Sequence, residues 1–281
     1  MGSAIGKRLI DSGFDVYTTF EGRSERTISQ AQKAGLKDAG SFESLINQTN
    51  TLLSIIPPGH AGSVAIKIAA AAEKMNPNLN FIECNAISPR TMNEISSLFK
   101  ENSTAVIDVG IIGGPPTPNS SPRIYCSGPN LNSLSVLSNA GLDVRVLSHK
   151  IGDASALKML YAASTKGTTA LWTQFLVAAK KLNLDEQLLL EFQRSRLEVS
   201  ESLIKEIPRM PRRAKRWIGE MNEIAQTFAD LGMTPNLMTG AAEIFKFVSE
   251  TSLSEQTSDE ENPSLDFALK TLVENLHKKN N

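Results

Sequence analysis

The chain has 281 residues, of which 41% are hydrophobic and 21% charged, values ordinary for a soluble globular protein of about two domains. Its net charge of −1 gives no electrostatic reason to expect a nucleic-acid or anionic-membrane partner. It shows no apolar run long enough to cross a bilayer and no secretory signal, so a cytoplasmic protein is expected.

The first 148 residues alternate between strand and helix patterns. Strands are predicted at 14–20, 52–56, 81–84, 105–109, 124–126 and 144–147, and helices at 2–12, 24–34, 60–74, 88–100 and 131–140. This alternation predicts an α/β domain over residues 1–148 with a doubly wound parallel (Rossmann) sheet. Cys84 and Cys126 fall in predicted strands and are expected as buried free thiols.

The remainder reads as helical throughout. Helices are predicted at 154–182, 184–194, 197–206, 212–231, 236–250 and 264–278, which indicates an all-α domain over residues 149–281. The polar, acidic segment 251–264 is expected to be a surface loop. The basic run at 212–216 with Trp217 is interpreted as a helix face at an intersubunit or interdomain contact, because so short a run in a near-neutral chain is weak support for nucleic-acid binding.

The long helix at 152–182 is unusually poor in charge. Asp153 is its expected N-cap, and between residues 154 and 179 only Lys158 and Lys166 are charged. The pattern indicates burial on most sides. One interpretation of Lys158 is a packed stem with its head in water, and the other is a cleft lysine whose lowered pKa suits a general base.

Four segments follow predicted strands, at residues 21–24, 57–58, 85–89 and 110–116. Ligands of doubly wound sheets bind at the carboxyl ends of the strands, where these segments gather. The helix that bears Lys158 begins just after the last strand. It is therefore expected to form the far wall of the same cleft.

Three motifs occur in an order that points to one family. They are Glu83-Cys-Asn-Ala-Ile-Ser-Pro89, Asp108-Val-Gly-Ile-Ile-Gly-Gly114, and Gly152 with Ala154, Ala156 and Lys158. They resemble the nicotinamide-side, substrate-loop and catalytic-helix motifs of the β-hydroxyacid dehydrogenases, which include 6-phosphogluconate and 3-hydroxyisobutyrate dehydrogenases. Pro115-Pro116, Tyr161-Ala-Ala-Ser-Thr-Lys-Gly167 and the segment 211–221 look like a less studied branch with its own C-terminal helical domain. The resemblance spans nearly the whole chain.

The resemblance implies a catalytic role for Lys158, as the general base that takes the hydroxyl proton while hydride goes to the nicotinamide. It implies substrate-binding roles for Gly113, Gly114, Tyr161 and Lys166. The glycines allow close backbone approach and anion binding, although an ordinary tight turn is the alternative. Lys166 fits a structural role equally well.

A cofactor-binding role is expected of nine residues: Gly2, Ser3, Glu21, Arg23, Ser24, Ile56, Pro57, Pro58 and Asn85. Arg23 and Ser24 suit the 2′-phosphate of NADP, whereas Glu21 suits the ribose of NAD, and NADP is the prediction with NAD as the alternative. Asn85 could bond the nicotinamide amide or the substrate, or simply form a turn. No metal is expected, because the three histidines show no ligand spacing.

Three departures from the family pattern stand out. Ile112 replaces the usual serine of the loop, and Ala162 replaces the usual asparagine of the helix. Gly2 looks like the last of three glycines, so the family's first strand and two earlier glycines are absent. That central strand normally lies between the strands at Val16 and Leu52, and without it they would lie about 9–10 Å apart with two unpaired edges. The hypothesis is an N-terminally incomplete version of a full-length enzyme.

The sequence thus predicts an NADP-dependent oxidoreductase acting on a small 3-hydroxy acid or related polar metabolite. The alternative is a catalytically inactive, nucleotide-binding or scaffold protein that keeps the fold. An imine reductase on a related scaffold ranks lower, because it would need a proton donor other than lysine. The substrate and the oligomeric state are open, although relatives of this architecture commonly form homodimers through the helical domain.

Overall fold

A computed structural model describes residues 1–99, 104–256 and 261–278. The chain divides into two compact units, Met1–Met159 and Leu160–Asn281. This division lies within a helix, later than the predicted limits of 1–148 and 149–281, which stay a prediction. In the described part of the chain, no helix combines the length and the apolar character needed to cross a membrane.

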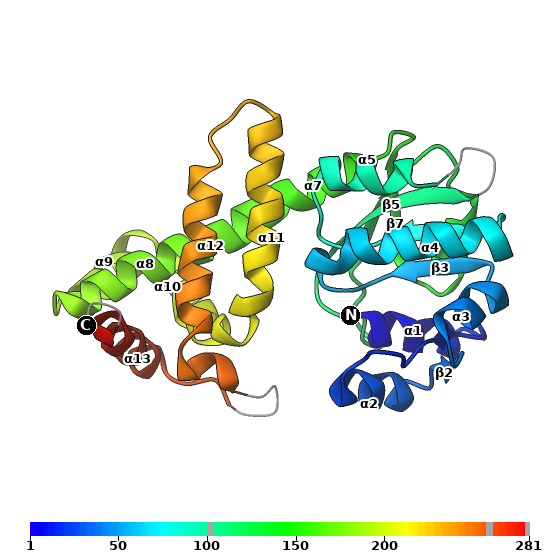
Figure 1. The fold of residues 1–281 in the computed structure, drawn as a ribbon. Coiled ribbons are helices and arrows are strands. Elements are labelled where there is room, and N and C mark those ends of the chain that lie inside the picture. The colour runs from blue at the N-terminus through cyan, green and yellow to red at the C-terminus, as the bar shows by residue number, and fades with distance from the viewer. Residues whose placement is uncertain (100–103, 257–260, 279–281) are drawn as a thin grey trace. The chain divides into compact units, whose positions relative to one another are not determined.

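The first unit contains two sheets where one was predicted (Figure 1). Strand β1 (Tyr17–Thr18) pairs in parallel with β2 (Lys37–Asp38). The other five strands form one sheet in the order β3-β4-β5-β6-β7: β3 (Thr51–Ser54), β4 (Asn80–Glu83), β5 (Ala105–Ile112), β6 (Arg123–Ser127) and β7 (Asp143–Ser148). The break falls between β1 and β3, where the sequence predicted a missing strand.

The doubly wound parallel sheet is confirmed, and strand β6 is its one exception among the described strands. It runs antiparallel to β5, pairing Val109 with Cys126, while the remaining pairs of this sheet are parallel. A parallel pair needs a crossover of a dozen or more residues, and residues 113–122 are too few. The sheet is therefore dominated by parallel strands, with one reversal.

Helices cover both faces of the five-stranded sheet. Helices α3 (Phe42–Gln48), α4 (Ala61–Met75) and α5 (Pro89–Ser97) lie on one face (Figure 1), and α1 (Gly2–Asp11) and α6 (Ser135–Asn139) on the other. Alternation along the strands divides the core accordingly: Phe81 and Val106 pack on the first face, and Ile82 and Ile107 on the second.

Some details of this unit differ from the predictions. Helix α2 (Glu25–Lys33) lies within the predicted range 24–34, with Ser24 as its N-cap. Strand β2 and helix α3 were not predicted, because residues 35–50 are polar and the elements are short. Helix α5 ends at Ser97, and the predicted end near Lys100 lies outside the described residues. Short 3₁₀ turns occur at Pro58–His60 and Asn132–Leu134. Cys84 and Cys126 are free and buried, as predicted.

The helical prediction for the rest of the chain is confirmed. The long helix consists of α7 (Asp153–Ala162), a π-helical turn (Ala163–Gly167) and α8 (Thr168–Lys181). The others are α9 (Asp185–Ser195), α10 (Leu197–Arg209), α11 (Pro211–Asp230), α12 (Asn236–Ser249), a 3₁₀ turn (Ser252–Glu255) and α13 (Leu265–Lys278). Helices α11 and α12 pack along each other (Figure 1). Between them, the Trp217 ring lies edge-on to the Phe245 ring.

The prediction of an exposed surface loop at 251–264 is wrong for its first residues. Thr251 and Leu253 are buried at the 3₁₀ turn, because Leu253 is apolar and packs inward. Residues 257–260 lie outside the described part of the chain.

Candidate functional site

Lys158 lies on α7 against β5. Its Nζ donates a hydrogen bond to the carbonyl oxygen of Ile111, and its side chain is half-buried. Ile111 stands near the end of β5, just before the turn at Gly113 and Gly114. The ammonium therefore lies at the end of β5, bonded to a residue two positions before Gly113.

Gly110 permits this close approach. A Cβ atom added there would lie 2.7 Å from the carbonyl oxygen of Ala154 and 3.1 Å from the Cβ atom of Lys158. Real Cβ atoms essentially never come as close to backbone as the first distance, so α7 would have to move if a side chain were present. The missing side chain thus sets the distance between Lys158 and β5.

Asp108 holds the beginning of α7 to the sheet. Its carboxylate accepts hydrogen bonds from the backbone N–H groups of Gly152 and Ser155 and from the hydroxyls of Ser155 and Ser127, at 2.6 to 3.0 Å. The Ser127 hydroxyl in turn accepts from the N–H of Ala154 at 3.0 Å. Burial raises the pKa of Asp108, and these hydrogen bonds oppose the rise. Three first-turn donors of α7 are thereby satisfied.

The predicted cap, Asp153, is corrected by this geometry. Asp153 is the first helical residue, and its carboxylate accepts from the Ser148 hydroxyl at 2.7 Å. The capping acceptor comes instead from β5, distant in sequence. An isolated carboxylate in the apolar run 105–112 is the signal that could have suggested it, because buried acids require partners.

The turn after β5 requires glycine at its first position. Gly113 has φ +124°, a left-handed conformation, and an added Cβ atom would lie 3.3 Å from the Cα atom of Pro122. Gly113 and Gly114 are both exposed. The turn therefore presents bare backbone at the end of β5, which agrees with the predicted substrate contact without testing it.

A second buried acid, Glu83, lies beside Asp108 at the end of β4. Burial raises the pKa of Glu83 to about 7, opposed by a hydrogen bond from the Asn85 N–H at 2.9 Å. Its side chain is therefore largely protonated below neutral pH and must ionise within the core above it. Because the folded state binds this proton more tightly than the unfolded chain, ionisation costs stability as the pH rises from about 4.5 to about 7.

Replacing Glu83 with Gln is expected to remove this dependence. At pH 8 the Glu83→Gln variant should be more stable than the wild type by about 3 kcal/mol, and near pH 4 the two should be alike. Urea unfolding followed by circular dichroism across this pH range measures the difference. Glu94→Gln, at an exposed position of α5, is the matched control and should follow the wild type. Parallel pH profiles for the two variants would contradict the assignment.

Asn85 is buried and its amide is engaged within the protein. The side-chain oxygen accepts from the N–H of Ile56 at 2.6 Å, and the side-chain nitrogen donates to the Ser54 hydroxyl at 2.9 Å. These bonds tie the end of β4 to the end of β3. Asn85 thus positions the segment at Ile56, and its predicted direct contact with the cofactor stays a prediction.

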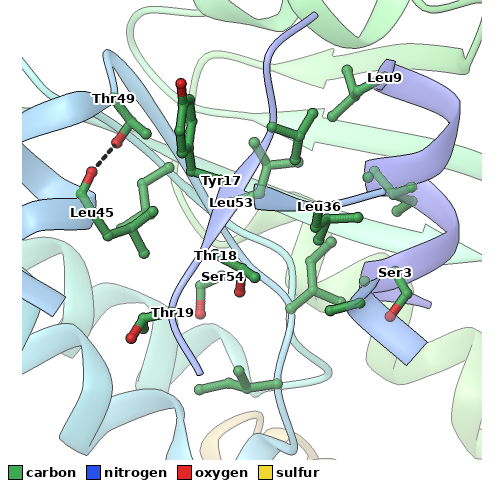
Figure 2. A pocket seen from close by; sticks show the side chains of 18 of the residues that line it. Ser3, Leu9, Tyr17, Thr18, Thr19, Leu36, Leu45, Thr49, Leu53 and Ser54 are labelled. Atoms are coloured by element: carbon green, nitrogen blue, oxygen red, sulfur yellow. Dashed lines mark hydrogen bonds between the residues drawn. The ribbon is translucent and has the colours of Figure 1, made fainter. Parts of the chain in front are cut away.

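Figure 2 shows a cavity of about 740 Å³ with Ser3 among the residues that line it. Five of the nine predicted cofactor residues line this cavity. These five are Gly2, Ser3, Arg23, Ile56 and Pro57. Glu21, Ser24, Pro58 and Asn85 are not among the residues lining it. The Ser24 hydroxyl accepts from the Thr27 N–H and so caps α2.

The other two predicted substrate residues belong to the second unit. Tyr161 is exposed, whereas Lys166 is largely buried and lies 2.7 Å from the Glu220 carboxylate. Glu220 also pairs with Arg216 at 3.2 Å, and the Lys166 ammonium lies 5.7 Å from the centre of the Trp217 ring. This internal pairing favours the structural interpretation of Lys166.

Two family comparisons match successive parts of the chain. Residues 1–136 match the family described as the NAD binding domain of 6-phosphogluconate dehydrogenase. Residues 179–248 match a domain of unknown function, DUF1932. The motifs in the sequence had predicted this combination.

A relative from Methanothermus fervidus, described as an uncharacterized 28.5 kDa protein in the 7S RNA 5′ region, is 31% identical over 175 residues. The match covers 62% of this chain and 66% of the relative, just under two thirds of the relative's length. It supports common ancestry but carries no activity.

Solved structures share the fold over nearly the whole chain. A conserved protein of unknown function, described as similar to 3-hydroxyacid dehydrogenases, is 28% identical with a TM-score of 0.65, covering 91% of this chain and 95% of its own. The 3-hydroxyisobutyrate dehydrogenase of Mycobacterium tuberculosis is 17% identical with a TM-score of 0.65, covering 97% and 95%. A reductive aminase from Aspergillus terreus in complex with NADPH is 13% identical with a TM-score of 0.53, covering 96% and 95%.

Proposed function

We propose that this chain, which carries a 6-phosphogluconate dehydrogenase-like NAD-binding domain followed by a helical C-terminal region, is an NADP-dependent oxidoreductase. Its substrate is a small 3-hydroxy acid or related polar metabolite, which it interconverts with the keto form. The observation that carries the proposal is the hydrogen bond from the Lys158 ammonium to Ile111, beside the Gly113–Gly114 turn.

Lys158 moves the proton in this reaction. In the oxidation direction its neutral amine takes the proton from the substrate hydroxyl, and in reduction its ammonium returns the proton to the carbonyl oxygen. The nicotinamide, when bound, accepts or supplies the hydride. Asp108 and Gly110 hold Lys158 in place through the start of α7, and the exposed backbone at Gly113 and Gly114 suits a substrate carboxylate.

The residues that line the cavity favour NADP, a dinucleotide with an additional 2′-phosphate, as the cofactor. Its lining joins the N-terminus of α1, at Gly2 and Ser3, with Arg23. A helix N-terminus favours a pyrophosphate and a guanidinium favours a 2′-phosphate. Ile56, which follows β3, also lines the cavity. Only β4 separates β3 from β5, so these two strands lie about 10 Å apart at normal strand spacing. NADPH in the Aspergillus reductive aminase makes this cofactor the first to test.

The inactive alternative has support of its own. Strands β1 and β2 form a sheet separate from β3–β7, so the sheet that would support the cofactor is interrupted between β1 and β3. A protein in this state could keep its helical region and its core yet bind a nucleotide poorly. Binding of the cofactor therefore distinguishes the two candidates before any substrate is known.

The test is a fluorescence titration of the full chain with NADPH and with NADH. We expect saturable NADPH binding, with Arg23→Ala losing about tenfold in NADPH affinity and little in NADH affinity, because only NADPH has the phosphate that a guanidinium would hold. Arg26→Ala is the matched control, because Arg26 is exposed on α2 and outside the cavity lining. Failure of both nucleotides to bind would favour the inactive protein.

The proposal includes a homodimer through the helical region. Large apolar side chains are exposed there: Leu171 by 59%, Leu237 by 74% and Phe267 by 55%. Such exposure is a reason to expect a partner surface, and a second copy of the chain is the simplest partner.

A further inference from the structure

Four polar side chains of β6 and β7 share one face of the five-stranded sheet. They are Arg123, Tyr125, Asp143 and Arg145, and we call them the arginine strip. Ile124, Cys126 and Val144 pack into the core with α1 and α6, so the residues that alternate with them point to the opposite face. The Arg145 guanidinium accordingly lies 5.7 Å from the centre of the Tyr125 ring.

The same face carries α7 and Lys158. Ser127, the next residue of β6 on this face, accepts from the N–H of Ala154 at 3.0 Å. Gly110 pairs with Tyr125 across the two strands, and a Cβ atom added at Gly110 would lie 3.1 Å from the Cβ atom of Lys158. Residues directly opposite in an antiparallel pair are close neighbours. The arginine strip therefore begins beside the stem of Lys158.

Arg123 lies at the end of this strip that is next to the glycine turn. It pairs with Ile112, the last residue of β5. The residue before it, Pro122, is the one whose Cα atom an added Cβ at Gly113 would approach to 3.3 Å. Because β6 runs antiparallel to β5, the start of β6 lies at the carboxyl end of β5, the edge at which ligands bind in such sheets.

The charges of the strip do not balance. The Asp143 carboxylate accepts from Arg145 through both of its oxygens, at 3.0 Å from Nε and 2.8 Å from Nη2. Hydrogen bonding from Arg145, and to a smaller extent the charge of Arg123, lowers the pKa of Asp143. Arg123 is half-buried, and within the described residues its guanidinium makes no hydrogen bond or ion pair. One cation of the strip is thus left without an anion that bonds to it.

We propose that Arg123 determines substrate specificity by binding a second anionic group of the substrate, in addition to the carboxylate suited to the Gly113–Gly114 turn. This group is a carboxylate or a phosphate, because the planar guanidinium donates to either through two parallel N–H groups. The inference rests on the proposed function, since that proposal places the substrate between this turn and Lys158. It adds the charge of the substrate and the residue that recognises it.

The test is isothermal titration calorimetry of the full chain with three acids. 3-Hydroxybutyrate has one anionic group, whereas 3-hydroxyglutarate adds a carboxylate and 3-hydroxy-4-phosphobutyrate adds a phosphate. We expect one of the two dianionic acids to bind about tenfold more tightly than 3-hydroxybutyrate, and the tighter of the two identifies the group. Equal affinities for the three acids, or binding of none, would overturn the proposal.

Three variants assign the preference to Arg123. Arg123→Met should lower the affinity for the preferred dianionic acid about tenfold and leave that for 3-hydroxybutyrate within about twofold. Arg194→Met, at an exposed position of α9, is the matched control and should keep the wild-type preference. Asp143→Asn should change the affinity in the opposite direction, raising it about threefold, because it removes the neighbouring carboxylate. Equal losses for all three acids in Arg123→Met would show a structural role and contradict the assignment.

Failure of this inference is distinguishable from failure of the proposed function, because calorimetry needs no turnover. If the dianionic preference is present and Arg123→Met removes it while neither nucleotide binds, only the oxidoreductase proposal fails. If NADPH binds and the three acids bind equally, the oxidoreductase proposal stands and the role of Arg123 is wrong.

Discussion

Replacing Lys158 with Met is expected to lower turnover about a thousandfold while the NADPH dissociation constant stays within about twofold of the wild type. Methionine preserves much of the length of the side chain but carries no proton. The loss should therefore appear in the chemical step, because the cofactor residues are untouched. The assay follows NADPH absorbance with the 3-hydroxy acid that the wild type oxidises fastest.

Lys158→Arg separates proton transfer from charge. Arginine keeps the positive charge and can still donate to the Ile111 carbonyl, but its guanidinium does not give up a proton in proteins. The Arg variant should therefore be about as inactive as the Met variant. If it retains more than about a tenth of the activity, Lys158 acts by its charge alone and the general-base role is wrong.

Replacing Asp108 with Leu is expected to lower the free energy of unfolding by about 4 kcal/mol. The change removes the acceptor shared by two N–H groups and two hydroxyls, and a buried donor without a partner costs about 1–3 kcal/mol. The expected loss is smaller than the sum of these costs for four donors, because the start of α7 can loosen and let water bind some of them. Urea unfolding followed by circular dichroism measures it.

The matched control is Asp143→Leu. Asp143 also lies on a strand, but it is exposed and pairs with Arg145 at the surface, so its loss should cost less than about 1 kcal/mol. Similar values for the two variants would show that the Asp108 hydrogen bonds do not hold α7 to the sheet.

Much of the fold could be predicted from the sequence because its elements have strong local patterns. The strands at 81–84 and 105–109 are uniformly apolar, and every helix after residue 150 has the helical period, so both are found within a few residues. Strand β2 and helix α3 were missed because they are short and polar. The reversal of β6 depends on the length of the link before it, and strand patterns alone do not report direction.

Site residues could be predicted from the sequence only where they belong to a recognisable motif. Lys158 and the Gly113–Gly114 turn follow from motif order, and in the structure the Lys158 ammonium bonds to Ile111, two residues before Gly113. Asp108 and Gly110 act through contacts with α7, 44 or more residues away, so no local pattern could assign their roles. The use of the Asn85 amide to hold Ile56 was hidden for the same reason.

The two buried cysteines have a practical consequence for work on this protein. Burial raises the pKa of the Cys126 thiol to about 12 and that of Cys84 well above its usual range, so neither offers a thiolate to an alkylating reagent near neutral pH. The chain has no other cysteine. Cysteines introduced at the surface would therefore be labelled selectively in the native protein, one for a single probe or two for a spin or fluorophore pair, without removing either natural thiol.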